Sequence, residues 1–410
     1  MSREKVILVG VETEENYRHF ESSMQELVQL AKTAEAEIVQ LFTQKRTTVD
    51  RQSLVGKGKL QELQRCIEEE EIDLVIFNQE LSPRQQQIIS EAVGVLVLDR
   101  VQLILDIFAL RARSKEGKLQ VELAQLNYLL PRLVGQGASM SRLGAGIGTR
   151  GPGETKLETD RRHIRDRIAK IKRELKQVAD HRERTRTRRS QHATLQIGLI
   201  GYTNAGKSTI LNRLTAADTY EQDQLFATLD PLTKKWRLPE GLTVTLTDTV
   251  GFIQELPTQL VDAFHSTLEE SQDMDILLHV VDASSPERIQ QEATVLKLMK
   301  DLKLDTIPTL TIYNKADKIV ANQFIPTLFP NILVSAKNFQ GKEALAQGVK
   351  RFLMAIWEPY EQWLPAEKAG QLVTIERQTL IISKTFDEQQ NSYHLRGFRE
   401  KNDDNANVEE

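Results

Sequence analysis

Eight consecutive residues have the types and the spacing needed to hold a phosphate chain. The run Gly201-Tyr-Thr-Asn-Ala-Gly-Lys-Ser208 fits the pattern GxxxxGK[ST], follows the apolar stretch Leu195–Ile200 and precedes a helix-like segment. In this context the glycines let main-chain amides turn toward phosphate oxygens at the positive end of the helix. The Lys207 ammonium would reach the β- and γ-phosphates, and the Ser208 hydroxyl would bind Mg²⁺. The nucleotide contacts predicted here are Gly201, Tyr202, Thr203, Asn204, Ala205, Gly206, Lys207, Ser208 and Thr209.

Two later segments offer groups for a divalent cation and for the last phosphate. Asp248-Thr-Val-Gly251 ends a predicted strand, so the Asp248 carboxylate can hold Mg²⁺ through water and the Gly251 amide can contact the γ-phosphate. Thr228 can coordinate Mg²⁺ only while a γ-phosphate is present. We therefore predict catalytic roles for Lys207, Thr228 and Gly251, and metal ligands at Ser208, Thr228 and Asp248. The other nucleotide contacts predicted in these segments are Phe226, Ala227, Leu229, Asp230, Thr249 and Val250.

The base is predicted from two further loops. The NKAD sequence at 314–317 follows the apolar stretch Leu310–Tyr313, and the SAK sequence at 335–337 follows Ile332–Val334. The two oxygens of Asp317 match the paired N–H donors of guanine, which adenine lacks, and a site built to pair donors rejects an analogue without them. The Ala336 amide is expected near the guanine oxygen. The predicted contacts for GTP and GDP are Asn314, Lys315, Ala316, Asp317, Ser335, Ala336 and Lys337.

One absence bears on the rate of hydrolysis. Phe252 follows Gly251, where Ras-like enzymes carry a glutamine that orients the attacking water. A phenylalanine cannot orient water by hydrogen bonding, so hydrolysis should be slow without a partner's group, a rearranged loop or a bound cation. Asn204 is a candidate ligand for a monovalent cation, so K⁺ is a second candidate cofactor beside Mg²⁺.

The predicted elements indicate a multidomain α/β protein. Residues 1–110 alternate apolar runs with helical patterns, which is typical of a parallel sheet covered by helices. Residues 111–192 read as a helical hairpin or coiled-coil arm, and residues 193–358 as a P-loop GTPase domain. Residues 359–410 read as a small α+β extension with strands at Leu372–Ser383 and Ser392–Phe398 and an acidic tail. No residues typical of a catalytic site occur in the first part.

The arm is the basic part of a nearly neutral chain. Residues 111–190 hold 21 Lys and Arg against 9 Asp and Glu, a local charge of +12 beside −16 for the other 330 residues. Leucines and isoleucines recur at heptad spacing on both sides of a stretch with seven glycines between Gly135 and Gly153. Pro131 is expected to kink or end the first helix. A basic hairpin with a glycine-rich loop favours a polyanionic partner, and a plain linker is the alternative for the loop.

Composition narrows the class of protein. With 410 residues, 27% charged and 40% hydrophobic, the chain is typical of globular proteins and not of disordered or collagen-like ones. Cys66 is the single cysteine, so a disulfide within the chain is excluded and a reducing, cytoplasmic setting is expected. The most apolar stretches are too short or too charged to span a membrane, and no export signal is evident.

At the level of whole motifs the sequence resembles the HflX family, within the Obg–HflX branch of the translation-associated GTPases. The segments DTVGFI at 248–253, GKGKLQEL at 56–63 and GIGTRGPGETKLETDRR at 146–162 are similar to that family's hallmarks, and the match runs from about Val6 to about Phe352. Lys156 stands where many relatives are expected to have glutamine. The resemblance implies a cytoplasmic GTPase that binds the large ribosomal subunit and splits idle or stalled ribosomes.

The resemblance also implies that the arm and its loop approach ribosomal RNA near the peptidyl-transferase region. A second, ATP-linked activity is associated with the N-terminal domain of the family, but no motif here supports it. A monomer without stable membrane insertion is expected. Two alternatives remain from the residues alone: a nucleotide-gated RNA-binding module with little turnover, and a GTPase of tRNA modification or of the membrane surface.

Overall fold

The computed structural model forms two compact units. It describes residues 3–140, 152–189, 194–215, 225–226, 231–253, 270–320 and 324–401. Unit 1 comprises Met1–Arg182, Asp223–Leu229 and Gln254–Ser266. Unit 2 comprises Glu183–Gln222, Asp230–Ile253 and Thr267–Glu410. The four-part division at residues 110, 192 and 358 stays a prediction.

Unit 1 begins with a four-stranded parallel sheet in the order β2-β1-β3-β4. The apolar runs that predict strands, Val6–Val11, Ile38–Phe42, Leu74–Phe77 and Val95–Leu98, all lie at strands of this sheet, and the helical patterns between them form three helices. The elements are β1 (Lys5–Glu12), α1 (Phe20–Thr33), β2 (Glu37–Lys45), α2 (Lys57–Glu70), β3 (Leu74–Phe77), α3 (Pro83–Val93) and β4 (Leu96–Asp99). The central strands β1 and β3 are buried on both faces and read as continuous apolar runs, which is why the sequence predicted them, whereas the edge strand β2 is partly exposed.

Residues near the helix ends determine where α3 and α2 begin. The Ser82 side chain accepts a hydrogen bond from the Gln85 amide, the Ser82 amide donates one to Gln85 Oε1, and Pro83 occupies the first turn. Gly56 caps the N-terminus of α2, so the GKGK segment is a turn that leads into a helix. A further helix, α4 (Arg100–Arg111), is buried along most of its length because it packs against α1, α5 and the sheet.

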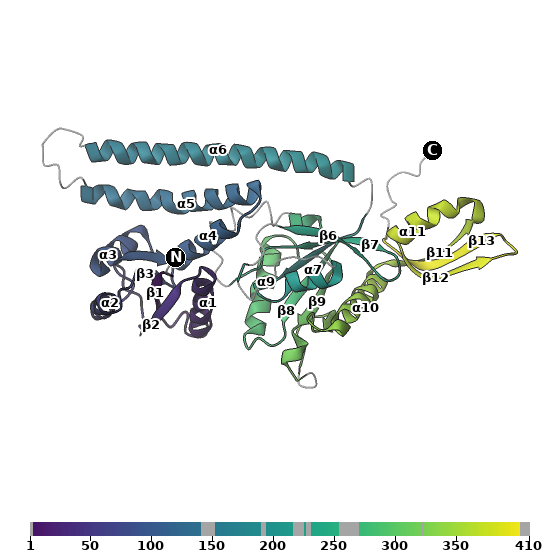
Figure 1. Ribbon diagram of the computed structural model, residues 1–410, viewed down its shortest axis with the longest axis horizontal. Coiled ribbons are helices and arrows are strands. Elements are labelled where there is room, and N and C mark those ends of the chain that lie inside the picture. The colour runs from purple at the N-terminus through teal and green to yellow at the C-terminus, as the bar shows by residue number, and fades with distance from the viewer. Residues whose placement is uncertain are drawn as a thin grey trace. The chain divides into compact units, whose positions relative to one another are not determined.

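The predicted helical hairpin consists of α5 (Lys115–Met140) and α6 (Pro152–Arg189), which lie side by side in Figure 1. A bidentate ion pair joins them, with Arg167 Nε and Nη2 at 2.6 and 2.7 Å from the Glu122 carboxylate oxygens. The apolar seam between the helices contains the predicted heptad residues Leu119, Leu123, Leu126, Ile168, Ile171 and Leu175.

Two expectations for the hairpin were only partly right. Pro131 does not end α5, which continues to Met140, and the kink that was the other possibility stays a prediction. Its neighbour Arg132 fixes this part of α5 to the N-terminal domain by donating to Leu81 O at 2.7 Å, and its guanidinium stacks within the helix, 3.3 Å from the Tyr128 ring centroid. The glycine-rich loop is accordingly shorter than predicted, because residues 135–140 and 152–153 are helical. Residues 141–151 lie outside the described part of the chain.

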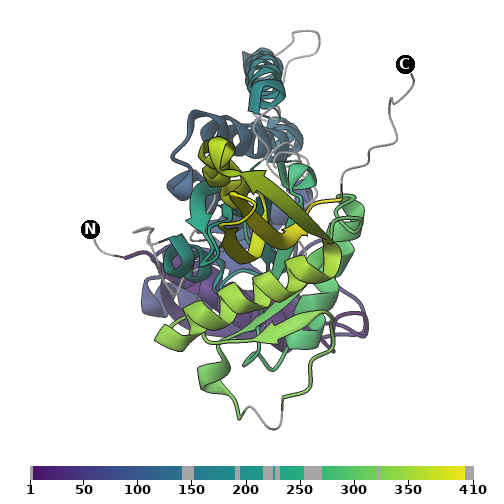
Figure 2. The same cartoon turned by 90° about the vertical axis from the view of Figure 1, so that its right-hand side faces the viewer.

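Unit 2 contains a six-stranded sheet in the order β10-β9-β8-β5-β7-β6, parallel except for β6. Its core includes apolar residues of α7 and α10, and α10 runs along the sheet (Figures 1 and 2). The elements are β5 (Gln196–Gly201), α7 (Lys207–Thr215), β6 (Leu232–Arg237), β7 (Thr243–Asp248), η2 (Glu270–Asp273), β8 (Ile276–Asp282), α9 (Arg288–Asp301), β9 (Thr309–Asn314), η3 (Ala316–Lys318), β10 (Asn331–Leu333) and α10 (Phe339–Ile356).

A three-stranded antiparallel sheet in the order β11-β13-β12 ends the described chain. The strand predicted at Leu372–Ser383 was wrong in its first half, because residues 372–378 form a helix that packs against η5 and β7. This tertiary packing overrides the strand preference of the β-branched residues there. The elements are β11 (Glu358–Pro365), η5 (Ala366–Gln371), α11 (Leu372–Gln378), β12 (Leu380–Asp387) and β13 (Ser392–Arg399).

Among the described residues, every helix is too short or too polar to span a bilayer.

Candidate nucleotide-binding site

The phosphate loop leaves β5 at Gly201 and enters α7 at Lys207, as predicted. Gly206 has a φ of +100°, and a Cβ there would lie 2.2 Å from Asn314 Nδ2, so glycine is required. Asn314 Nδ2 donates to Ala205 O at 3.0 Å, and Asn314 Oδ1 accepts the Ala336 amide at 2.9 Å. Asn314 therefore ties the phosphate loop to the two loops that are predicted to contact the base.

Lys207 is enclosed by the loop that precedes it. Its Nζ donates to Gly201 O at 3.0 Å and to Tyr202 O at 2.9 Å, and the residue is 5% exposed. Burial lowers the pKa of Lys207 to about 8, and the charge of Asp248 opposes this effect in part. An anion placed beside this ammonium would restore a favourable environment for its charge.

Ser208 and Asp248 meet although they are far apart in sequence. The Ser208 hydroxyl donates to Asp248 Oδ2 at 2.6 Å. Asp248 ends β7, which pairs with β5 so that Asp248 lies opposite Leu199. Two of the three predicted Mg²⁺ ligands therefore converge where the phosphate loop begins its helix. A hydroxyl and a carboxylate suit a hard cation that completes its shell with phosphate and water oxygens. The described residues contain no cluster of three His, Cys, Asp or Glu side chains that could hold a metal by themselves.

The segment after Asp248 lies against the phosphate loop. Phe252 forms a β-bridge with Tyr202: the Thr203 amide donates to Phe252 O at 2.7 Å, and the Phe252 amide donates to Gly201 O at 3.1 Å. The Phe252 residue is 3% exposed, so its ring packs in the interior. A Cβ built on Gly251 would lie 3.0 Å from Lys207 Nζ, which places the predicted γ-phosphate contact next to the predicted phosphate-binding lysine.

The loops predicted to read guanine are held by side chains as well as by backbone. The Ser335 hydroxyl donates to Asp317 Oδ1, and this hydrogen bond lowers the pKa of Asp317, so the exposed carboxylate stays ionised. Lys315 has a φ of +63° and forms an ion pair with Asp282 at 2.8 Å. The Ala336 amide, which was expected to face the base, donates to Asn314 in this structure.

The Phe226–Asp230 segment is only partly described. Thr228, Ala227, Leu229 and Asp230 lie outside the described residues, so their predicted roles stay predictions. Phe226 is described, and its ring packs edge-on against Phe108 of α4 at 4.5 Å between centroids. Both rings belong to unit 1, and Phe226 is 2% exposed. The ring of Phe226 is thus a packing group, and the nucleotide contact predicted for this residue stays a prediction.

His279 was not singled out from the sequence. It lies in the otherwise apolar strand β8 and is 1% exposed, and its Nε2 has no hydrogen-bond partner among the described residues. Burial, and to a smaller degree the charge of Lys207, lowers the pKa of His279 to about 4. The imidazole is therefore neutral near pH 7. The signal in the sequence was a histidine within the otherwise apolar run ILLHVV at 276–281.

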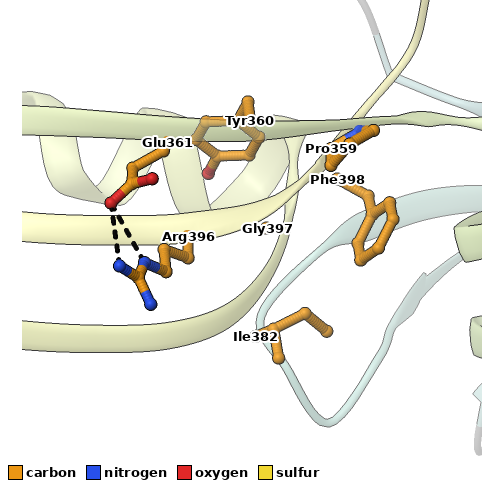
Figure 3. A pocket seen from close by; sticks show the side chains of 7 residues that line it. All are labelled: Pro359, Tyr360, Glu361, Ile382, Arg396, Gly397 and Phe398. Carbon is orange, nitrogen blue, oxygen red and sulfur yellow. Dashed lines mark hydrogen bonds and ion pairs between the residues drawn. The ribbon is translucent and has the colours of Figure 1, made fainter.

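A shallow groove of about 520 Å³ lies on the C-terminal sheet (Figure 3). Its rim carries the ion pair between Glu361 and Arg396, at 3.0 Å. The same glutamate accepts a hydrogen bond from His394, whose ring stacks on Trp363. None of the residues predicted to bind nucleotide lines this groove, which is formed by Pro359, Tyr360, Glu361, Ile382, Arg396, Gly397 and Phe398.

Comparisons with known proteins agree with this architecture. Family models match residues 21–109 (GTP-binding GTPase N-terminal), 111–189 (GTP-binding GTPase Middle Region) and 196–315 (50S ribosome-binding GTPase). The GTPase HflX of Alkalihalophilus pseudofirmus is 53% identical over 96% of this chain and 93% of its own. The GTPase HflX of Escherichia coli K12 is 39% identical over 91% of this chain and 88% of its own. A GTP-binding protein of Sulfolobus solfataricus, solved with GDP, is 26% identical over 85% of this chain and 98% of its own, with a TM-score of 0.45.

A phosphate loop, a DxxG segment and an NKxD segment at the ends of strands of one mainly parallel sheet define a P-loop GTPase. The strength and the length of the matches narrow this class further. The chain belongs to the HflX family of GTPases and is a GTP-hydrolysing enzyme.

Proposed function

We propose that this GTPase binds the large ribosomal subunit through its helical arm and acts in splitting or rescuing ribosomes, or in their biogenesis. GTP and GDP bind at the phosphate loop, and the basic arm contacts ribosomal RNA. The observation that carries the proposal is the combination, in one chain, of a nucleotide site and a hairpin whose segment has a charge of +12.

The residues of the nucleotide site support distinct roles. Lys207 binds the terminal phosphates, Gly251 contacts the γ-phosphate through its amide, and Asp317 reads the base. Ser208 and Asp248, with Thr228, would hold Mg²⁺, and this ion neutralises phosphate charge when it is bound. Asn204, at a φ of +60° in the loop, is the proposed ligand for K⁺.

The arm presents its charge on the side away from its seam. Ile168 and Ile171 face α5, whereas basic residues at the intervening positions of α6 are exposed. Cations along a helix bind phosphates without reading base sequence, so the partner surface should be structured RNA. Among the described side chains of α6, the exposed basic residues are Arg162, Arg165, Lys170, Lys172, Arg173 and Lys176. The family model described as a 50S ribosome-binding GTPase supports the same partner. A cytoplasmic monomer is the simplest form of such a protein.

Single-turnover GTP hydrolysis, measured with and without purified large subunits, tests the proposal. We expect stimulation by the subunits, and a Lys207→Ala variant should lose it together with nucleotide binding. An unstimulated rate would favour a nucleotide-gated RNA-binding module.

A matched pair of variants tests the arm. Lys170→Ala with Arg173→Ala removes two exposed charges from α6, and Lys297→Ala with Lys300→Ala removes two exposed charges at the same spacing from α9. The first pair should weaken subunit binding. It should also lower the slope of log binding constant against log salt concentration by about two, since each lost phosphate contact lowers this slope by about one. Equal effects of the two pairs would contradict the assignment of the arm.

A further inference from the structure

Thr203 carries a buried hydroxyl group in the phosphate loop. The residue is 6% exposed, and its Oγ1 has no hydrogen-bond partner within the described part of the chain. Neighbouring hydroxyls are engaged: Thr249 Oγ1 donates to Leu199 O at 2.7 Å, and Ser208 donates to Asp248. Because an unpaired buried hydroxyl is unfavourable, one in a functional loop points to a ligand that completes it.

The surroundings of Thr203 indicate which part of the ligand this is. A Cβ built on Gly251 would lie 2.8 Å from Thr203 Cγ2 and 3.0 Å from Lys207 Nζ. The Thr203 amide also donates a hydrogen bond to the carbonyl oxygen of Phe252 at 2.7 Å. Thr203 thus lies beside the lysine and the glycine that are assigned to the terminal phosphate, and at the loop's end nearest the DxxG segment.

The residue that follows Gly251 brings no polar side chain to this point. Phe252 is buried, and its backbone is paired with the loop, so it offers no side-chain hydrogen bond to a water or a phosphate. Phosphoryl transfer depends on positioning and on stabilising charge at the phosphoryl oxygens. A threonine hydroxyl can donate one hydrogen bond and accept two.

We propose that Thr203 is a catalytic residue of GTP hydrolysis, whose hydroxyl donates a hydrogen bond to the γ-phosphoryl group. Water forms the new bond to the γ-phosphorus, and the bond to the β-phosphate oxygen breaks with its electron pair staying on GDP. The proton lost by the water passes to the released phosphate. Thr203 keeps its proton throughout and acts only by stabilising charge. The inference rests on the proposed nucleotide site. It assigns to Thr203 a contact with the γ-phosphoryl group, which GDP lacks.

Three variants test this role. Thr203→Val removes the hydroxyl and keeps the shape, and Thr203→Ser keeps the hydroxyl. Thr245→Val is the matched control, because the Thr245 hydroxyl contacts Leu195 O at 3.3 Å at the far end of β7. Each is measured for single-turnover hydrolysis, for the Kd of GDP and of a non-hydrolysable GTP analogue, and for Tm without nucleotide.

We expect Thr203→Val to hydrolyse GTP at least tenfold more slowly, with the Kd for GDP within twofold of the parent value. Thr203→Ser should stay within threefold of the parent rate, and Thr245→Val should keep it. The Tm of Thr203→Val without nucleotide should equal or exceed that of the parent, because the substitution removes an unpaired hydroxyl.

A parent rate in Thr203→Val would overturn the proposal, and so would equal losses in Thr203→Val and Thr203→Ser or a lower Tm in Thr203→Val. Failure of the nucleotide site itself has a separate signature. In that case Lys207→Ala would bind GDP as tightly as the parent does.

Discussion

Nucleotide binding should take up a proton at Lys207. Burial lowers the pKa of this lysine to about 8, whereas its ordinary value is 10.5. A polyphosphate against Nζ favours the charged ammonium and raises this pKa again. The nucleotide therefore selects protonated Lys207, and affinity should fall as pH rises through 8.

The pKa sets the size of the effect. With a value of about 8, Lys207 is about one-tenth neutral at pH 7 and about half neutral at pH 8. Proton uptake should rise from about 0.1 to about 0.5 per nucleotide, and the Kd for GDP should increase about twofold. Since the pKa is lower in the folded than in the unfolded chain, the protein without nucleotide should gain stability as pH rises between about 8 and 10.5.

Isothermal titration calorimetry measures this uptake directly. GDP is titrated at pH 7 and pH 8 in two buffers of different protonation enthalpy, and the difference in apparent enthalpy gives the number of protons. Lys207→Arg is the control, because a guanidinium stays charged at both pH values and should take up none. Absence of uptake at pH 8 in the parent, or equal uptake in Lys207→Arg, would refute the reasoning.

Three other substitutions have defined outcomes. Asn314→Ala removes two buried hydrogen bonds and should lower the free energy of unfolding, measured in urea, by about 2 kcal/mol, with weaker GDP binding. The control is Asn338→Ala, because the Asn338 side chain makes no capping hydrogen bond, and it should change neither the free energy of unfolding nor GDP binding. Ile171→Ala, at a fully buried seam position, should cost about 2–4 kcal/mol in the same assay, whereas Leu129→Ala, 41% exposed, should cost under about 1 kcal/mol. Asp317→Asn should shift selectivity from guanine toward xanthine nucleotides in a competition assay, and a retained guanine preference would contradict the base assignment.

The sequence predicted those parts of the fold that have local causes. The central strands β1, β3 and β8 are nearly continuous apolar runs, and the phosphate loop is fixed by glycines and by the strand and helix beside it. The Ser82–Pro83 start of α3 and the seam of the hairpin around Ile171 likewise follow from neighbouring residues. These features depend on spacing along the chain, which a single sequence displays.

The parts that escaped prediction depend on residues far apart in the sequence. Phe226 packs on Phe108, which lies 118 positions earlier, and no local pattern marks that contact. Helix α11 forms from residues that favour strands, because packing against β7 decides its conformation. Pro131 stays within a helix whose adjacent residue Arg132 is fixed to the N-terminal domain by a hydrogen bond to Leu81 O.

The most direct measurement of the central claim is co-sedimentation of the full chain with purified large ribosomal subunits through a sucrose gradient. The gradient is run with GDP and, in parallel, with a non-hydrolysable GTP analogue. Our account predicts that the protein migrates with the subunits in the presence of the analogue and stays largely at the top with GDP. Equal migration with both nucleotides, or no migration with either, would contradict it.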